Sequence, residues 1–237
     1  MTRLILPLLL ILLQIAAPAR AEETVAEFTI GLRGVTIGTL RLSGLRSEER
    51  YSASAAINSV GVAEGIHPFS YRGKVEGEPF RDGYIPGHYE ESINTGRRQS
   101  SAVIEYWSGV PKVLSVRSLA ATAADSPVPH LQGDALDPLT VLFDMMRDRQ
   151  VGPICNRRHF LFDGVRRSML RLGAPAVEGD LVTCYGEYRR LKGFAADEMA
   201  RQRSFSLAAV YEHAAGRLRL VRVDVDSVYG VVTLHRR

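Results

Sequence analysis

Apolar and polar residues alternate along most of this chain. In residues 69–76, every second position is apolar or small and the positions between are polar or charged. A period of two is typical of an antiparallel strand with one buried face. Similar segments recur almost to the end, separated by turn signals such as Asp82-Gly83 and Asn94-Thr95-Gly96. The pattern therefore predicts a meander of about eleven strands.

So many strands joined by short turns do not suit a flat open sheet in a domain of this size. Antiparallel sheets limit their exposed edges by curling. We therefore expect a mainly β fold, an antiparallel meander curled into a barrel or half-barrel. Because no linker rich in Pro or Ser divides residues 22–237, we expect them to form a single domain.

The period changes in residues 138–148, which are predicted to form one short helix. Asp137 is a good N-cap, and Pro138 fits the first helical position. The apolar stripe of this helix consists of Leu139, Leu142, Phe143 and Met146. A helix this short needs an apolar surface to be stable, so it should cover one mouth or the concave face of the sheet. It is either a core-packing helix or a lid over a binding cavity.

The first 21 residues have the layout of a cleavable signal peptide. Arg3 precedes an apolar run, Leu4–Ala17, which is short for a membrane-spanning helix, and Ala19-Arg20-Ala21 is a small-x-small cleavage site. We expect cleavage after Ala21 and export of the mature chain. The mature chain should not span a membrane, because no second apolar run approaches the necessary length.

Charge is distributed unevenly along the mature part of the chain. Residues 22–146 carry 11 basic and 16 acidic side chains, whereas residues 147–237 carry 17 basic and 10 acidic ones. Such charges usually lie on solvated faces, and the other interpretation is an anionic partner such as a lipid headgroup or cell-wall polymer. A nucleic-acid partner is not expected, because there is no basic helix or aromatic stacking motif.

Cys155 and Cys184 are the two cysteines of the chain. An even number in an exported protein suggests a disulfide. Their spacing is far wider than that of a thioredoxin-type pair, and with His159 they would still lack a clear fourth zinc ligand. A structural disulfide between them is therefore expected.

The chain contains no motif of a known catalytic, nucleotide-binding or metal site. There is no G-x-S-x-G, H-E-x-x-H, P-loop, G-x-G-x-x-G or EF-hand pattern, and the six histidines are scattered singly. Glu90 and Glu91 should point to opposite faces of a strand and cannot pair with each other. Asp163 and Gly164 give the strongest hairpin signal, so turn geometry explains Asp163 without a role as a general base. We expect no catalytic residue, metal site or cofactor.

Several short motifs, in their order and spacing, resemble those of the domain of unknown function 3108, a family of exported proteins of Gram-negative bacteria. The motifs are Asp137-Pro138-Leu139 with Phe143, Cys155, Phe162-Asp163-Gly164 followed by Arg166-Arg167, Cys184, Gly193-Phe194, and Tyr229 to Leu234. The resemblance covers nearly the whole mature chain, although the N-terminal strands fit more loosely. It implies a periplasmic, mainly antiparallel β protein without assigned catalytic residues.

Three classes of function remain open at this point. The first is a non-catalytic envelope protein whose curved sheet binds an apolar or amphiphilic molecule, similar in expected shape to periplasmic lipid and lipoprotein carriers. The second is an envelope scaffold or assembly factor that pairs an edge strand with another envelope protein. The third is a hydrolase of cell-wall or lipid substrates, which would need a polar cluster inside the cavity.

Overall fold

The computed structural model describes residues 21–96, 99–118 and 125–237. The strands in chain order are β1 (Glu22–Leu32), β2 (Val35–Arg46), β3 (Tyr51–Ser59), β4 (Ser70–Phe80), β5 (Gly83–Asn94), β6 (Gln99–Trp107), β7 (Val110–Ser118), β8 (Ala135–Leu136), β9 (Arg149–Gln150), β10 (Arg157–Phe162), β11 (Arg167–Glu178), β12 (Leu181–Lys192), β13 (Ser204–Ala214), β14 (Arg217–Ser227) and β15 (Gly230–Arg236). The helices are α1 (Val62–Ile66), α2 (Pro138–Met146) and α3 (Ala196–Arg201), with a 3-10 turn, η1 (Pro129–Leu131).

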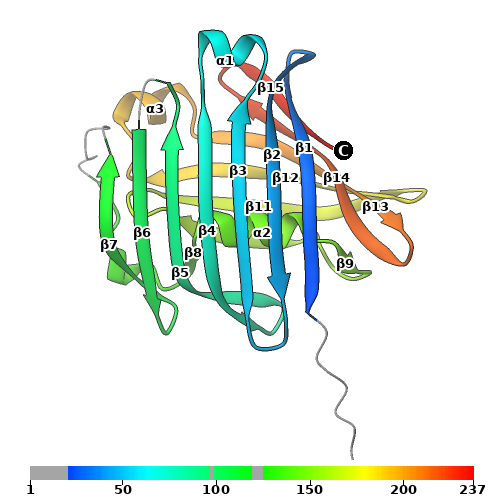
Figure 1. The fold of residues 1–237 in the computed structure, drawn as a ribbon, viewed down its shortest axis with the longest axis horizontal. Helices are drawn as coiled ribbons and strands as arrows, with labels where there is room; N and C mark the ends of the chain where they lie inside the picture. The colour runs from blue at the N-terminus through cyan, green and yellow to red at the C-terminus, as the bar shows by residue number, and fades with distance from the viewer. Residues whose placement is uncertain (1–20, 97–98, 119–124) are drawn as a thin grey trace, which may run out of the picture.

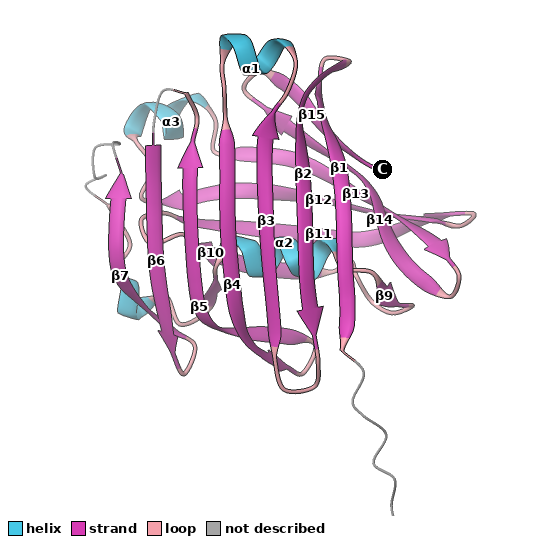
Figure 2. Ribbon diagram, viewed as in Figure 1, coloured by secondary structure: helices cyan, strands magenta, loops and turns pink. Residues whose placement is uncertain are grey.

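All fifteen strands belong to one sheet that folds over on itself. The pairing path runs β7-β6-β5-β4-β3-β2-β1-β15-β14-β13-β12-β11-β10-β8, and β9 pairs with β14. Strands β1–β7 form one layer, and β11–β14 cross behind it at a steep angle (Figure 1). Helix α2 lies between the two layers (Figure 2). The mainly β, antiparallel and curled fold is therefore as predicted, and no pairing among the described residues joins the two ends of the path, β7 and β8.

The sheet has more strands than the predicted eleven. Strands β8 and β9 are two residues long, too short for any period to reveal. Residues 173–179 show no clear alternation in the sequence, yet most of them belong to β11, which continues to Glu178 past a register shift between Leu172 and Pro175. The β-bulge explains why a regular alternation is lost there, since it shifts side chains to the other face.

Two helices besides α2 are present where the sequence predicted connections. Helix α1 connects β3 to β4, and α3 connects β12 to β13. Neither buries a residue, so no apolar stripe marks them. The predicted helix 138–148 ends two residues early, because Arg147 is already extended and Arg149 pairs with β14.

Helix α2 begins as its sequence predicts. Asp137 is extended, and its Oδ1 accepts a hydrogen bond from the Thr140 amide at 2.8 Å. Its Oδ2 accepts another from Thr140 Oγ1 at 2.6 Å, and Thr140 Oγ1 lies 2.7 Å from the hydroxyl of Tyr51. Asp137 is fully buried, so these contacts compensate a carboxyl group that has no access to water. The cap thereby ties the helix to β3.

The buried face of α2 packs against aromatic side chains of the front layer. Leu139, Phe143 and Met146 are buried, and Leu142 is half-buried against the core. The ring centroid of Phe143 lies 6.2 Å from that of Tyr51. On β2, a Cβ on Gly44 would come within 2.5 Å of the Phe143 ring, so the ring needs the space that glycine leaves. The helix therefore packs as a core helix over this part of the sheet.

A disulfide joins the loop before β10 to β12. Cys155 and Cys184 are both buried, and their sulfur atoms are bonded. The bond links residues that are 29 positions apart within the back layer. It therefore ties the hairpin of β10 and β11 to the strand that follows.

The expected signal peptide, residues 1–21, lies outside the described residues except for Ala21. Helices in the described part of the chain are all too short or too polar to cross a bilayer. Helix α2 leaves part of the interior open.

Candidate functional site

The curled sheet contains a cavity of about 520 Å³, and the segments that line it lie above α2 in the view of Figure 1. One wall comes from the upper ends of β5, β6 and β7. The facing wall comes from the β10–β11 turn, the end of β12, α3 and the β14–β15 turn. We call this space the upper cavity, and its volume is within the range that small organic ligands occupy.

Glu91 of β5 points into the upper cavity. It follows Tyr89 by two residues, so both side chains lie on the inner face of the strand, whereas Glu90 faces outward and pairs with Lys74. The buried Tyr89 hydroxyl donates to Glu91 Oε2 at 2.6 Å. Burial raises the pKa of Glu91 to about 7, and the negative charge of Asp163 adds to the effect. The carboxyl group therefore changes charge near neutral pH.

Asp163 brings a second carboxyl group to the same cavity from the β10–β11 turn. Its Oδ1 accepts hydrogen bonds from the backbone amides of Val165 at 2.9 Å and Arg166 at 2.6 Å. Burial raises the pKa of Asp163, and these two hydrogen bonds oppose the shift. Gly164 has a φ of +93°, which favours glycine in this turn. The turn thus presents the carboxyl group to the opposite wall.

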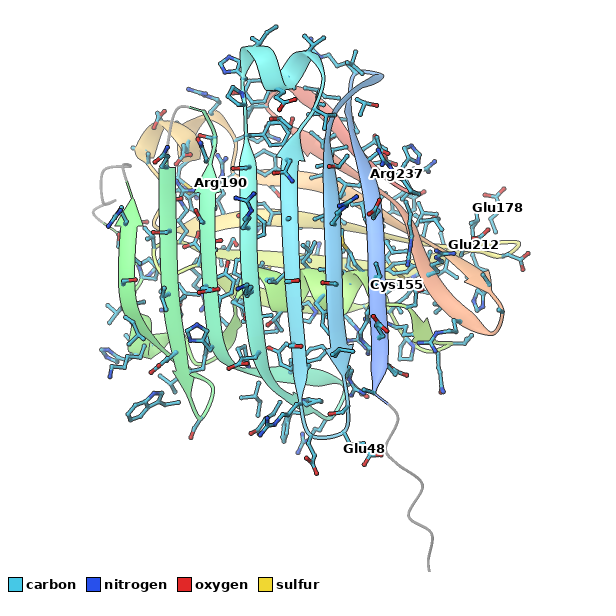
Figure 3. All side chains as sticks on the ribbon, in the orientation of Figure 1. Glu48, Cys155, Glu178, Arg190, Glu212 and Arg237 are labelled. Carbon is cyan, nitrogen blue, oxygen red and sulfur yellow. A yellow bond between two sulfur atoms is a disulfide. The ribbon has the colours of Figure 1, made fainter. Side chains whose placement is uncertain are left out.

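Arg166 and Arg190, two of the arginines that line the upper cavity, are held by partners of their own. Arg190 donates to the backbone carbonyls of Glu198 at 2.8 Å and Gln202 at 3.0 Å, and its guanidinium group lies over the ring of Phe194. Figure 3 shows Arg190 at the upper end of the molecule, near α3. Arg166 lies 3.6 Å from Glu198 and also stacks over Phe194. These cations therefore brace α3 against the back layer.

The two carboxyl groups, in contrast, keep acceptor capacity toward the cavity. Within the described residues, neither Glu91 Oε1 nor Asp163 Oδ2 accepts a hydrogen bond from a neighbouring group. Apolar side chains, among them Ile93, Val116 and Val228, share the same walls. The cavity therefore offers carboxylate oxygens beside an apolar surface, an arrangement that suits a molecule with a hydrogen-bond-donating or cationic end and a hydrocarbon part.

The residues identified from the sequence lie in different parts of the structure. Asp137 and the helix residues 139–146 fill the interior below the cavity, and Cys155 and Cys184 stabilise the back layer. Asp163, interpreted as a turn residue, has that role and also lines the upper cavity. The predicted turn residues therefore contribute to the site, and the disulfide does not line it.

Sequence reasoning missed Glu91, Arg166 and Arg190 as members of one site. The alternation in β5 correctly placed Glu90 and Glu91 on opposite faces, but it did not show which of them faces inward. The aromatic side chain of Tyr89 two positions earlier is the local signal that Glu91 shares the buried face. Within the described residues, no group of three His, Cys, Asp or Glu side chains is placed to hold a metal ion.

Comparisons with known proteins add one structural likeness. No family model matches the chain, and no curated protein matches it. The fold is similar to the crystal structure of a β-barrel-like protein of the domain of unknown function DUF1849 from Brucella abortus, with a TM-score of 0.47 and 9% sequence identity over 91% of this chain and 94% of that chain. At this score the likeness carries no information about function. The resemblance to the domain of unknown function 3108 stays a prediction.

Proposed function

We propose that this protein is an exported, non-catalytic binding protein of the cell envelope that holds an amphiphilic molecule in the upper cavity. A cationic or hydrogen-bond-donating head of the ligand would contact Glu91 and Asp163. Its hydrocarbon part would lie along the apolar side chains of the walls, including Ile93 and Val116. The export signal in the first 21 residues supports the location.

The observation that carries the proposal is the pair of half-buried carboxyl groups, each with one oxygen that accepts no hydrogen bond among the described residues. Partial loss of hydration disfavours the charged form and raises the pKa of both groups, even though one oxygen of each accepts hydrogen bonds. A ligand ammonium group would supply the missing hydrogen bonds and the opposite charge. Arg166 and Arg190 attract an anion less strongly, because both already have partners.

Isothermal titration calorimetry with decylamine, decanol and decanoate would test the proposal, because these probes share one chain and differ in the head. We expect the amine to bind most tightly and decanoate most weakly. Amine binding should strengthen from pH 6 to pH 8 as Glu91 ionises. Glu91→Gln should remove both the preference for the amine and its pH dependence.

Glu90→Gln is the matched control, since Glu90 is the neighbouring carboxyl group on the outer face. It should bind all three probes as the wild-type protein does. Equal binding of amine and decanoate, or an unchanged amine affinity in Glu91→Gln, would contradict the proposal.

A hydrolase is the second candidate, because two carboxyl groups with raised pKa in one cavity can act as an acid and base pair. Chromogenic glycosides and esters with the wild-type protein and Glu91→Gln would test it. The binding proposal predicts no turnover that depends on Glu91. A loss of hydrolysis in Glu91→Gln, with retention in Glu90→Gln, would instead establish the catalytic function.

A further inference from the structure

Basic side chains gather at the opposite end of the interior from the upper cavity, where α2 ends. Arg46 is the last residue of β2, Arg147 caps the C-terminal end of α2, and Arg149 belongs to β9. The hydroxyl of Tyr84, at the start of β5, lies among their charges. We call these four residues the arginine cluster. Arg147 and Arg149 share one neighbour, since both approach Oδ1 of Asp144.

The arginine cluster carries more positive charge than its surroundings neutralise. Asp144 is buried and lies 2.9 Å from Arg149, but it also lies 3.2 Å from a fourth guanidinium group, that of Arg157. Glu22 is the other carboxylate in the described residues that meets the cluster, at 3.5 Å from Arg147. Four guanidinium groups therefore face two carboxylates.

A histidine beside Asp144 does not change this balance. His159 lies 3.9 Å from Asp144, and burial lowers its pKa, which leaves the ring neutral at pH 7. The net positive charge persists even though the side chains of Arg147 and Arg149 are only 14% and 9% exposed. Uncompensated charge with so little access to water is unfavourable.

Unpaired hydrogen-bond donors are concentrated in the same place. Five buried side-chain atoms lack a hydrogen-bond partner in the described part of the chain, and four of them belong to the arginine cluster. These four atoms are the Nε atoms of Arg46, Arg147 and Arg149 and the hydroxyl oxygen of Tyr84. Arg149 and Tyr84 are each 7% exposed, so bulk water does not satisfy them.

Arg157 shows what a structural arginine looks like at this end of the interior. It donates to the backbone carbonyls of Pro153 at 3.0 Å and Asp82 at 3.3 Å, in addition to its contact with Asp144. Its guanidinium group therefore cross-links three segments of chain. In contrast, Arg46 makes no hydrogen bond or ion pair among the described residues that would explain its position.

We propose that the arginine cluster is a binding site for a small oxyanion, a phosphate or carboxylate group. Guanidinium groups bind such anions through paired N–H donors, and a tyrosine hydroxyl can donate a further hydrogen bond. The bound anion neutralises the excess charge and satisfies the unpaired donors together. This site is separate from the upper cavity and does not depend on the function proposed for that cavity.

Thermal unfolding in increasing inorganic phosphate, against sodium chloride at matched ionic strength near pH 7, would test the site. We expect a saturable rise in melting temperature with phosphate for the wild-type protein. Arg46→Gln should weaken the apparent phosphate affinity at least about tenfold, the effect of losing one charge-assisted contact. Arg50→Gln, which changes an exposed arginine in the next turn, should behave as the wild-type protein does.

Tyr84→Phe is a second variant that keeps the ring and removes only an unpaired hydroxyl. Without phosphate it should be at least as stable as the wild-type protein, and with phosphate it should gain less stability. A wild-type protein that shows no saturable response to phosphate contradicts the site. A rise in melting temperature with phosphate that is the same in Arg46→Gln as in the wild-type protein also contradicts it. If Arg46→Gln does not fold, an unchanged rise in Tyr84→Phe contradicts the site instead.

Discussion

The lower half of the interior and the upper cavity share strand β5, but their side chains differ in kind. Strand β5 passes through both, with Tyr84 near its lower end and Glu91 near its upper end. In the lower half, Tyr84 packs against Tyr51 and Phe143, with ring centroids 4.5 and 5.8 Å away. At the upper end, Glu91 faces the carboxyl group of Asp163 across open space.

This difference shows that α2 decides which part of the curled sheet becomes core. A sheet curled this strongly encloses more volume than its own side chains fill, and α2 occupies the lower part of that volume. Beyond the helix, the space remains open and polar side chains can face it. We infer that stability depends mainly on the lower half, whereas the upper cavity is available for binding.

The sharpest contrast in stability should come from Phe143→Ala. The ring is fully buried between β2, β3 and β5, so its removal should lower the free energy of unfolding by about 3–5 kcal/mol. Val116→Ala, which shortens a 39% exposed side chain of the cavity wall, should cost less than about 1 kcal/mol. Urea denaturation of both variants would compare them, and equal losses would remove the distinction between the two regions.

Removal of the disulfide should be the next largest effect. In the chain-entropy model, closing a loop of this length stabilises the folded protein by roughly 3–4 kcal/mol. The double variant Cys155→Ser/Cys184→Ser should therefore lose about that much while keeping its far-UV circular dichroism spectrum. Reductant should destabilise the wild-type protein and leave the double variant unchanged. A melting curve unaffected by either treatment would contradict a structural role for the bond.

The ionisation of Glu91 in the upper cavity should lower the free energy of unfolding at high pH. The pKa of Glu91 is raised in the folded protein from 4.5 to about 7, so the folded state binds the proton more tightly than the unfolded state does. Its contribution is therefore most favourable below about pH 4.5 and is lost as pH rises through about 7. Glu91→Gln should be more stable than the wild-type protein by about 3 kcal/mol at pH 8 and similar to it at pH 4.

Denaturation at both pH values checks this sign, with Glu90→Gln as the control. Because Glu90 lies on the outer face, its substitution should not alter the pH dependence. A greater stability of the wild-type protein than of Glu91→Gln at pH 8 would show that the carboxylate already has a compensating partner.

Loss of the helix cap should have a smaller effect, confined to the lower half. Asp137→Ala removes the acceptors of the Thr140 amide and hydroxyl and should cost about 1–2 kcal/mol. Glu48→Ala, in the exposed β2–β3 turn, should leave the unfolding free energy within about 0.5 kcal/mol. Decylamine binding should persist in folded Asp137→Ala, and its loss would show that the two regions are coupled.

Much of the fold could be predicted because its causes are local. The period of two identified most strands, and Asp137-Pro138 marked the start of α2. The disulfide was predicted from the number of cysteines and the expected export signal. Strands β8 and β9 could not be found in this way, since a two-residue strand exists only through its pairing partner.

The site could not be predicted because its members meet only through the folding of the sheet. Glu91 and Asp163 are far apart in sequence and come from opposite layers, and no local pattern relates them. The excess of basic residues after position 146 was a clue of limited use. Some of these arginines brace α3 and others surround the end of α2, so the count alone did not locate either group.

The position of a bound amphiphile tests the division of the interior most directly. Methyl NMR spectra of the wild-type protein, recorded with a nitroxide-labelled alkylammonium probe, would report which Ile, Leu and Val side chains lie near the ligand. We predict selective broadening of Ile93, Val116 and Val165 of the upper cavity, with Leu139 and Val141 of α2 unaffected. Broadening of the α2 methyl groups, or none that saturates with the probe, would contradict a ligand site in the upper cavity.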